Sequence, residues 1–238
     1  MSSLKRIALI PARGGSKGVK KKNLSQIGGI SLLEWAITFA RESNQFDEIY
    51  IDTDDAEIQK IGSKLGCNVP RLRPSELATD SSSIIDSVKD FLSFISDRLD
   101  SKDTCIVLLQ PTTPFRSQTN LQEMIDVWLT HKGDKSIVSV TKPLQSPKDL
   151  VTKSNEGGWV SSLELSFGLT NRQEIPEHKF ITGGMYVFSR YFLEAHNALV
   201  VTDQSEFYDC EAISGIDIDD PHDLQIAQAI FAFGLSNF

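Results

Sequence analysis

The segment IALIPARGGSKGVKKKN, residues 7–23, decides how the rest of the chain is organised. Its first four residues are apolar and have the length of a short strand, which ends at Pro11. A glycine-rich loop follows, in which the missing Cβ atoms let backbone N–H groups approach an anion closely. The loop carries five positive charges in a chain whose net charge is −8: Arg13, Lys17, Lys20, Lys21 and Lys22. A buried strand that leads into such a loop is suited to hold a triphosphate.

Three other interpretations of this loop compete with a triphosphate site. A glycine-rich turn with solvated lysines needs no ligand. A P-loop is excluded because G-x-x-x-x-G-K-[ST] occurs nowhere in the chain. A dinucleotide-binding loop also fails, since Gly14, Gly15 and Gly18 do not fit G-x-G-x-x-G.

Length and composition indicate a soluble globular protein with one domain, residues 1–238, or one domain with an insertion. Charged residues make up 24% of the chain, and no apolar run approaches the roughly 20 residues that span a bilayer. The first residues have too short an apolar core for a signal peptide. We therefore expect a cytoplasmic protein without a membrane partner.

The cysteines and the acidic charge balance exclude two further classes. Three scattered cysteines do not predict a disulfide framework, and the four histidines show no zinc spacing with them. A pI near 5.0 argues against a nucleic-acid surface. An anionic substrate must then be attracted by local basic clusters.

Predicted strands and helices alternate along the chain, which indicates an α/β fold with a mostly parallel sheet. Ser31 and Glu34 form a capping box at the start of one helix. Asp52 and Asp54 lie at the end of the second strand, where an acid can hold a ribose in NAD enzymes, but we interpret Asp54 as a turn and helix-cap residue. The predicted strands are 7–10, 48–53, 104–109, 136–141, 184–189 and 216–219, and the predicted helices are 31–43, 55–65, 81–99, 118–131, 190–195 and one after Asp220.

The strand at 104–109 is almost wholly apolar, as expected of a central parallel strand. Gln110 follows at its carboxyl end, where ligands bind in open α/β sheets. A glutamine that caps its own turn is the alternative. Residues 142–181 interrupt the periodicity and predict a β-rich arm that packs on another subunit.

Two carboxylates near the end of the chain lack a structural explanation. Asp217 and Asp219 alternate along a predicted strand and should project to the same face, where like charges repel. A divalent cation with oxygen ligands would relieve that repulsion. Asp220 and Asp223, by contrast, are explained as the cap and first turn of the closing helix.

Five segments in order, IPARGGSKGVKKKN, LRPSELATD, LLQPTTPFR, RQEIP and IDIDDPHDL, resemble the successive motifs of the acylneuraminate cytidylyltransferase (CMP-sialic acid synthetase) family. The resemblance implies a Rossmann-like three-layer nucleotidyltransferase fold with a dimerisation arm at 142–181. It implies an enzyme that transfers CMP from CTP to the anomeric hydroxyl of a nonulosonic acid and releases pyrophosphate. Mg²⁺, or another divalent cation, and a homodimer with a swapped arm are implied as well.

Site residues follow from the same motifs. The resemblance implies catalytic roles for Arg13, Lys22 and Asp217, with Asp217 and Asp219 as the metal ligands. Asp217 could also accept the proton of the sugar hydroxyl, directly or through metal-bound water. The nucleotide-binding set is Arg13, Gly14, Ser16, Lys22, Asn23, Arg73 and Ser82, and the sugar-binding set is Gln110, Lys148, Arg172 and Gln173.

The chain departs from the family pattern in two places, so the identity of the acidic nine-carbon sugar stays open. Lys20 stands where the family usually has proline, and Thr182–Gly183 stands where it has Asn-Gly. Legionaminate, pseudaminate and the deaminated neuraminate are alternative substrates. The enzymes for 3-deoxy-octulosonate sugars have a different opening loop and rank lower. A catalytically silent nucleotide-sugar-binding protein and a Rossmann oxidoreductase are the alternatives from other classes.

Overall fold

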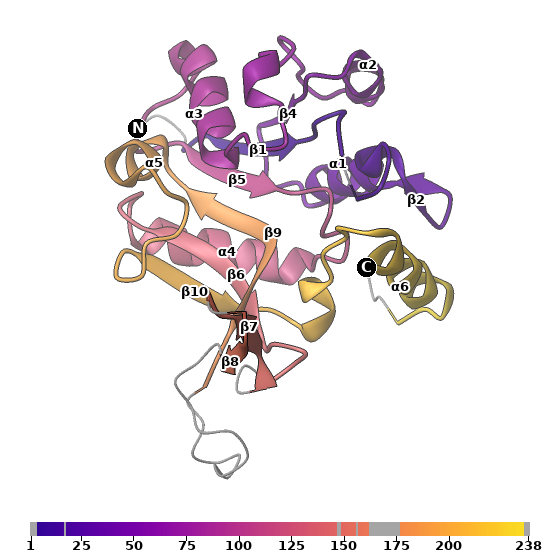
Figure 1. Ribbon diagram of the computed structural model, residues 1–238. Coiled ribbons are helices and arrows are strands. Elements are labelled where there is room, and N and C mark those ends of the chain that lie inside the picture. The colour runs from indigo at the N-terminus through magenta and orange to yellow at the C-terminus, as the bar shows by residue number, and fades with distance from the viewer. Residues whose placement is uncertain (1–3, 17, 147–148, 156, 162–176, 236–238) are drawn as a thin grey trace.

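The computed structural model describes residues 4–16, 18–146, 149–155, 157–161 and 177–235. Its centre is a six-stranded sheet in the order β10-β6-β9-β5-β1-β4 (Figure 1). β9 runs antiparallel to β5 and β6, whereas β1 pairs in parallel with β4 and β5, and β10 with β6. The strands are β1 Arg6–Pro11, β4 Glu48–Asp52, β5 Cys105–Leu109, β6 Ser136–Thr141, β9 Phe180–Phe188 and β10 Ser205–Asp209. The predicted α/β class with a mostly parallel sheet is confirmed.

Both faces of the sheet are covered, which gives the predicted three layers. In β1, Ala8 and Ile10 point into one apolar cluster, and Ile7 and Leu9 point into the other. Helices α1, α2 and α4 contribute to the first cluster, and α3 and α5 to the second. The helices are α1 Leu32–Glu42, α2 Ala56–Lys64, α3 Ile84–Phe94, α4 Gln118–Thr130 and α5 Arg190–His196.

Side-chain caps fix where the helices begin. The predicted capping box of Ser31 and Glu34 is present at α1. Asp55 caps α2 by accepting from the backbone N–H of Glu57 and Ile58, so the prediction that Asp54 caps this helix was wrong. Ser83 caps α3, and the helix therefore begins three residues after the predicted start at 81. A short 3₁₀ turn, η3 Ser96–Arg98, follows it.

The predicted strand at 216–219 was wrong. This segment follows the 3₁₀ turn η6 Ala212–Gly215 as irregular chain outside the sheet, and Ile218 N donates to Thr112 O at 2.9 Å. Helix α6 Pro221–Ala232 begins next, and its cap by Asp220 and Asp223 is as predicted. In the central sheet, the strand that the sequence analysis missed is β10, a polar edge strand whose middle residues are mostly exposed.

Two small hairpins complete the described structure. β2 Gln26–Ile27 and β3 Ile30–Ser31 form one that packs beside α6, where Trp35 and Phe231 make an edge-to-face contact. β7 Val151–Lys153 and β8 Trp159–Ser161 form the other within the predicted arm (Figure 1). Short turns η1 Lys22–Leu24 and η2 Ser75–Leu77 lie in the loops after β1 and α2. Across the described ranges, no helix has the length and apolar character needed to cross a membrane.

Candidate active site

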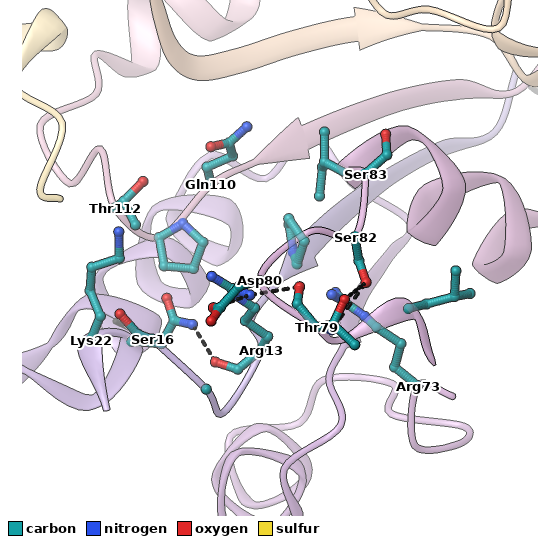
Figure 2. Close-up of a pocket in the computed structure, with 16 residues that line it drawn as sticks. Arg13, Ser16, Lys22, Arg73, Thr79, Asp80, Ser82, Ser83, Gln110 and Thr112 are labelled. Carbon is teal, nitrogen blue, oxygen red and sulfur yellow. Dashed lines mark hydrogen bonds and ion pairs between the residues drawn. The ribbon is translucent and has the colours of Figure 1, made fainter. Parts of the chain in front are cut away.

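A cavity of about 310 Å³ opens at the carboxyl ends of β1 and β5. Three segments form its wall: the loop after β1, the loop and helix start at 73–84, and residues 110–112 after β5. Figure 2 shows Lys22 and Thr112 on one side of the cavity and Arg73, Ser82 and Ser83 on the other. This edge of a parallel sheet is where α/β proteins bind ligands.

The glycines of the loop after β1 are required by close approaches to two acidic segments. A Cβ on Gly14 would lie 2.5 Å from Asp55 Oδ2, and one on Gly18 would lie 2.1 Å from the backbone oxygen of Asp219. The N–H of Gly14 donates to Asp54 Oδ1 at 2.9 Å. The loop is therefore held between the end of β4 and the segment before α6, and only glycine fits at these contacts.

Two basic side chains of this loop line the cavity. Arg13 donates through Nη1 to Thr79 O at 2.8 Å and lies 3.1 Å from Asp80 Oδ1. Lys22 Nζ lies 2.9 Å from Asp219 Oδ1, with 16% of the lysine side chain exposed. Lys21, in contrast, pairs with Glu57 on α2 and is no part of the wall. Lys17 lies outside the described residues.

Asn23 and Ser16 belong to the same wall. Asn23 is buried and donates from Nδ2 to Arg13 O at 2.8 Å, so its amide fixes the backbone on which the Arg13 side chain is mounted. Ser16 and Gly15 line the cavity, and a Cβ on Gly15 would meet no atom within 4 Å. The backbone at Gly15 is thus open to a ligand.

Arg73 lines the cavity, but its guanidinium is held by a buried carboxylate. Arg73 donates from Nε to Asp52 Oδ2 at 2.8 Å and from Nη2 to Asp52 O at 2.9 Å. Ser87 Oγ donates to the same Oδ2. Burial raises the pKa of Asp52, while Arg73 and Ser87 act against that rise. Because Asp52 is 1% exposed and Asp54 binds Gly14, neither is free to hold a ribose as in an NAD enzyme.

The loop between α2 and α3 is ordered by its own hydroxyl groups. Ser82 Oγ donates to Glu76 O at 2.9 Å and accepts from Thr79 N at 3.0 Å. Thr79 and Asp80 also line the cavity, and the sequence analysis assigned no role to either. Their place in the LRPSELATD motif was the available signal.

Asp217 and Asp219 flank Ile218, which is fully buried. Asp217 Oδ1 is buried without a hydrogen-bond partner among the described residues, whereas Asp219 is 75% exposed at its side chain and pairs with Lys22. Burial raises the pKa of Asp217; the Thr112 hydrogen bond and Lys22 oppose this, and the charges of Asp219 and Asp223 add to it. Neither Asp217 nor Asp219 lines the cavity directly; Lys22 and Thr112 connect them to it.

The carboxylate pair has the donor chemistry of a hard cation site. The described residues hold no cluster of three or more His, Cys, Asp or Glu suited to a metal. Two carboxylates, one with a buried oxygen lacking a partner, fit a cation such as Mg²⁺ that takes its other ligands from phosphates and water.

Gln110 lines the cavity directly after the carboxyl end of β5. A Cβ on Gly183 would lie 3.8 Å from Gln110 Oε1, so the glutamine side chain reaches toward the start of β9. Thr182 is 2% exposed, and its hydroxyl lies 2.6 Å from that of Ser139. The Thr182 side chain is thus used inside the sheet. Lys148, Arg172 and Gln173 lie outside the described residues.

Comparison with known proteins identifies the family. Residues 7–157 match the sequence profile of the family described as cytidylyltransferase. The chain belongs to this family. The match spans the loop after β1, the loop before α3 and the β5 end, so every segment of the cavity wall lies within it, and it confirms the resemblance drawn from the motifs.

Characterised cytidylyltransferases resemble the chain over much of its length. An N-acylneuraminate cytidylyltransferase of Escherichia coli is 31% identical over 94% of this chain and 51% of its own length. A CMP-N,N'-diacetyllegionaminic acid synthase of Legionella pneumophila is 38% identical over 57% of each chain. The chain spans about half the length of several curated relatives that it matches.

Solved structures of cytidylyltransferases share the fold. A structure of CMP:2-keto-3-deoxy-manno-octonic acid synthetase complexed with CTP superimposes with a TM-score of 0.71 at 16% identity, over 97% of this chain and 99% of that chain. At this identity the likeness concerns the fold alone. It agrees with the Rossmann-like nucleotidyltransferase architecture that the motifs implied.

Proposed function

We propose that the protein transfers CMP from CTP to the anomeric hydroxyl of a nonulosonic (sialic-type) acid, giving the CMP-sugar and pyrophosphate. The observation that carries this proposal is the meeting of three features at one cavity. A glycine loop with Arg13 and Lys22 offers phosphate contacts, Gln110 faces the same space, and Lys22 links it to Asp217 and Asp219. Relatives named for N-acylneuraminate and for N,N'-diacetyllegionaminic acid support CMP transfer to this class of acceptor.

The nucleotide would lie along the loop after β1. Arg13 and Lys22 would neutralise phosphate charge, and Ser16 and the open backbone at Gly15 would add hydrogen bonds. Asn23 would keep the Arg13 backbone in place. Arg73 and Ser82, on the far wall, would lie near the cytosine, where their existing bonds to Asp52 and Glu76 hold the base site rigid.

The sugar would enter beside Gln110. The assignment of Lys148, Arg172 and Gln173 to the sugar carboxylate and hydroxyls rests on the family motifs, with Lys148 acting on the neighbouring subunit's site. Gly183 next to Gln110, where the family has a glycine after asparagine, leaves room on this side. The Thr182 side chain points into the sheet, so it does not select among the sugars. The acceptors to be compared are therefore N-acetylneuraminate, legionaminate, pseudaminate and the deaminated neuraminate.

The chemical step needs no protein nucleophile. The anomeric hydroxyl oxygen bonds to the α-phosphorus of CTP, the bond from that phosphorus to the bridging oxygen breaks, and pyrophosphate leaves. Arg13 and Lys22 stabilise the charge that develops on the phosphates. Asp217, whose pKa is raised by burial, would accept the hydroxyl proton. A divalent cation held by Asp217 and Asp219 would neutralise phosphate charge and lower the pKa of the attacking group.

The arm supports a homodimer. Among the described residues of this region, Leu144, Trp159 and Phe180 are 74%, 70% and 49% exposed. Trp159 lies on the β7–β8 hairpin, Leu144 follows β6 and Phe180 begins β9. Exposed apolar side chains in one region of the chain are typical of a protein interface. In a dimer the arm would complete the sugar site of the neighbouring subunit.

The test is pyrophosphate release from CTP measured with each of the four sugars and without sugar. We expect release that requires both CTP and one of these sugars, with one sugar clearly preferred by kcat/KM. If calorimetry shows CTP binding but no sugar leads to pyrophosphate release, the protein is the catalytically silent binding protein. Tight binding of NAD in place of CTP would indicate the oxidoreductase.

A further inference from the structure

Arg116, a charged residue to which the sequence analysis gave no role, lies entirely in the interior. It is 1% exposed and sits between β5 and α4, with its guanidinium 5.7 Å from the centre of the Phe39 ring. Burying a guanidinium is costly unless its donors and its charge are compensated. No carboxylate of the described residues forms a direct ion pair with it, so the compensation must come from other groups.

Two backbone carbonyls provide part of that compensation. Arg116 donates from Nε to Gly184 O at 3.0 Å and from Nη2 to Gln110 O. Gly184 belongs to β9, and Gln110 is the first residue after β5 and part of the cavity wall. The guanidinium therefore joins two neighbouring strands directly behind the wall, and it sets the position of the Gln110 backbone.

The charge of Asp217 adds to that compensation. Burial lowers the pKa of Arg116 to about 9, and the negative charge of Asp217 raises it. Asp217 Oδ1 and Arg116 Nη1 are both buried and both lack a hydrogen-bond partner among the described residues. Ile218 N donates to Thr112 O, which attaches the Asp217 segment to the same wall that Arg116 supports. Asp217 therefore lies within the electrostatic influence of Lys22, which lines the cavity, and of Arg116, which lies behind its wall.

We propose that Arg116 is a positioning residue: from behind the cavity wall it fixes the Gln110 backbone and orients the Asp217 carboxylate toward the site. This inference rests on the proposed function. Arg116 lines no part of the cavity and touches no substrate; it acts through the two residues in front of it. The planar guanidinium of arginine can donate to two carbonyls and attract a carboxylate at the same time. A lysine ammonium group cannot fully replace it.

The experiment compares Arg116→Met, Arg116→Lys and the control Arg71→Met with wild type. Arg71 is also largely buried, but it pairs with Asp90 and packs on Phe94, away from the cavity. For each variant we would measure CTP-dependent pyrophosphate release with N-acetylneuraminate and the Mg²⁺ concentration that gives the half-maximal rate. Calorimetry would measure the binding of CTP alone, and thermal melting would measure stability. The best acceptor of the four-sugar assay replaces N-acetylneuraminate if it differs.

We expect Arg116→Met to lower kcat by about 10- to 100-fold, as for partners that orient an active-site ligand, and to raise the Mg²⁺ requirement. CTP binding should change less than about threefold, and Arg116→Lys should recover part of kcat. Combined with Asp217→Asn, Arg116→Met should cause little further loss, because its effect passes through Asp217. A purely structural arginine would add its loss to that of Asp217→Asn.

Each other result contradicts the inference. If Arg116→Met does not fold, Arg116→Lys decides: a folded lysine variant with wild-type kcat and Mg²⁺ dependence would mean that Arg116 only stabilises the fold. The same conclusion follows if Arg71→Met loses kcat as strongly as Arg116→Met, or if the double variant shows additive losses. An inactive wild type would instead overturn the proposed function, whereas an active wild type with unaffected Arg116 variants overturns this inference alone.

Discussion

Lys22 Nζ lies 2.9 Å from Asp219 Oδ1, a contact between two residues that are 197 positions apart in the sequence. Asp219 is mostly exposed, but only 16% of the Lys22 side chain is exposed. The lysine is therefore directed from the glycine loop toward the acidic segment before α6. In the proposed reaction, Lys22 would turn to the phosphates and leave Asp219 to a cation. This pair joins the nucleotide side of the site to its acidic side.

Asp217→Asn should abolish most turnover without unfolding the protein. The substitution keeps the shape of the side chain and removes the charge of the carboxylate that we propose as metal ligand and proton acceptor. We expect turnover to fall about 100-fold or more and the Mg²⁺ requirement to rise, measured by pyrophosphate release in a Mg²⁺ titration. Asp223→Asn is the control, since Asp223 accepts from the backbone N–H of Asp219 and Asp220 as part of the α6 cap. Wild-type turnover in Asp217→Asn together with an inactive Asp223→Asn would reverse the assignment.

Asp217→Asn should also change how the stability of the protein depends on pH. Because burial raises the folded-state pKa of Asp217 above its usual 3.8, the folded protein binds this proton more tightly than the unfolded chain does. The ionised carboxylate therefore destabilises the fold at pH 7, and the destabilisation is relieved as the pH falls through the raised pKa. Asp217→Asn should melt at or above the wild-type temperature at pH 7, and the difference should shrink toward pH 4. A variant that melts lower at pH 7 would contradict this sign.

Gly18→Ala should separate the glycine loop from the acidic segment. The added Cβ would lie 2.1 Å from the backbone oxygen of Asp219, so one of the two segments must move. We expect a loss of about 1–3 kcal/mol in the free energy of unfolding together with weaker CTP binding. Denaturant unfolding and calorimetry measure the two effects. Gly158→Ala is the matched control, because its nearest neighbour is 3.7 Å away on the arm hairpin, and CTP affinity equal in both variants would disprove the coupling.

Arg73→Met should be strongly destabilising. It leaves the carboxylate of Asp52, which is 1% exposed at its side chain, buried without its counter-charge. Removing one partner of such a pair costs about 3–5 kcal/mol of unfolding free energy. Urea unfolding measures the loss. Glu57→Gln, which breaks the exposed contact with Lys21, should leave the midpoint nearly unchanged, and a comparable loss in both variants would mean that burial does not matter here.

The protein should be a dimer through its arm. Light scattering at micromolar concentration should give twice the chain mass of 26.4 kDa. Trp159→Lys should shift the mass toward the monomer and raise the sugar KM more than the CTP KM, because only the sugar site is shared. Trp35→Phe, remote from the arm, serves as the control. A monomer of 26.4 kDa with full activity would remove both the dimer and the role of Lys148 across subunits.

The sequence alone determined the features that depend on neighbouring residues in the chain. The caps at Ser31 and Asp220 are fixed by hydrogen bonds within four positions, so their side chains can be read directly. The apolar run of β5 and the glycine loop after β1 are local for the same reason. They were sufficient to predict the α/β fold and to identify the cytidylyltransferase family.

Tertiary structure decided the features that need a distant partner. Alternation at 216–219 predicted a strand, but a strand also requires a free sheet edge beside it, and this segment instead meets Thr112. β10 is polar and became a strand because β6 offered such an edge. The partners of Arg73, Lys22 and Arg116 lie 21, 197 and 68 positions away. Whether a charge pairs, or is buried behind a wall, is set by the packing that brings such positions together, and no local pattern records it.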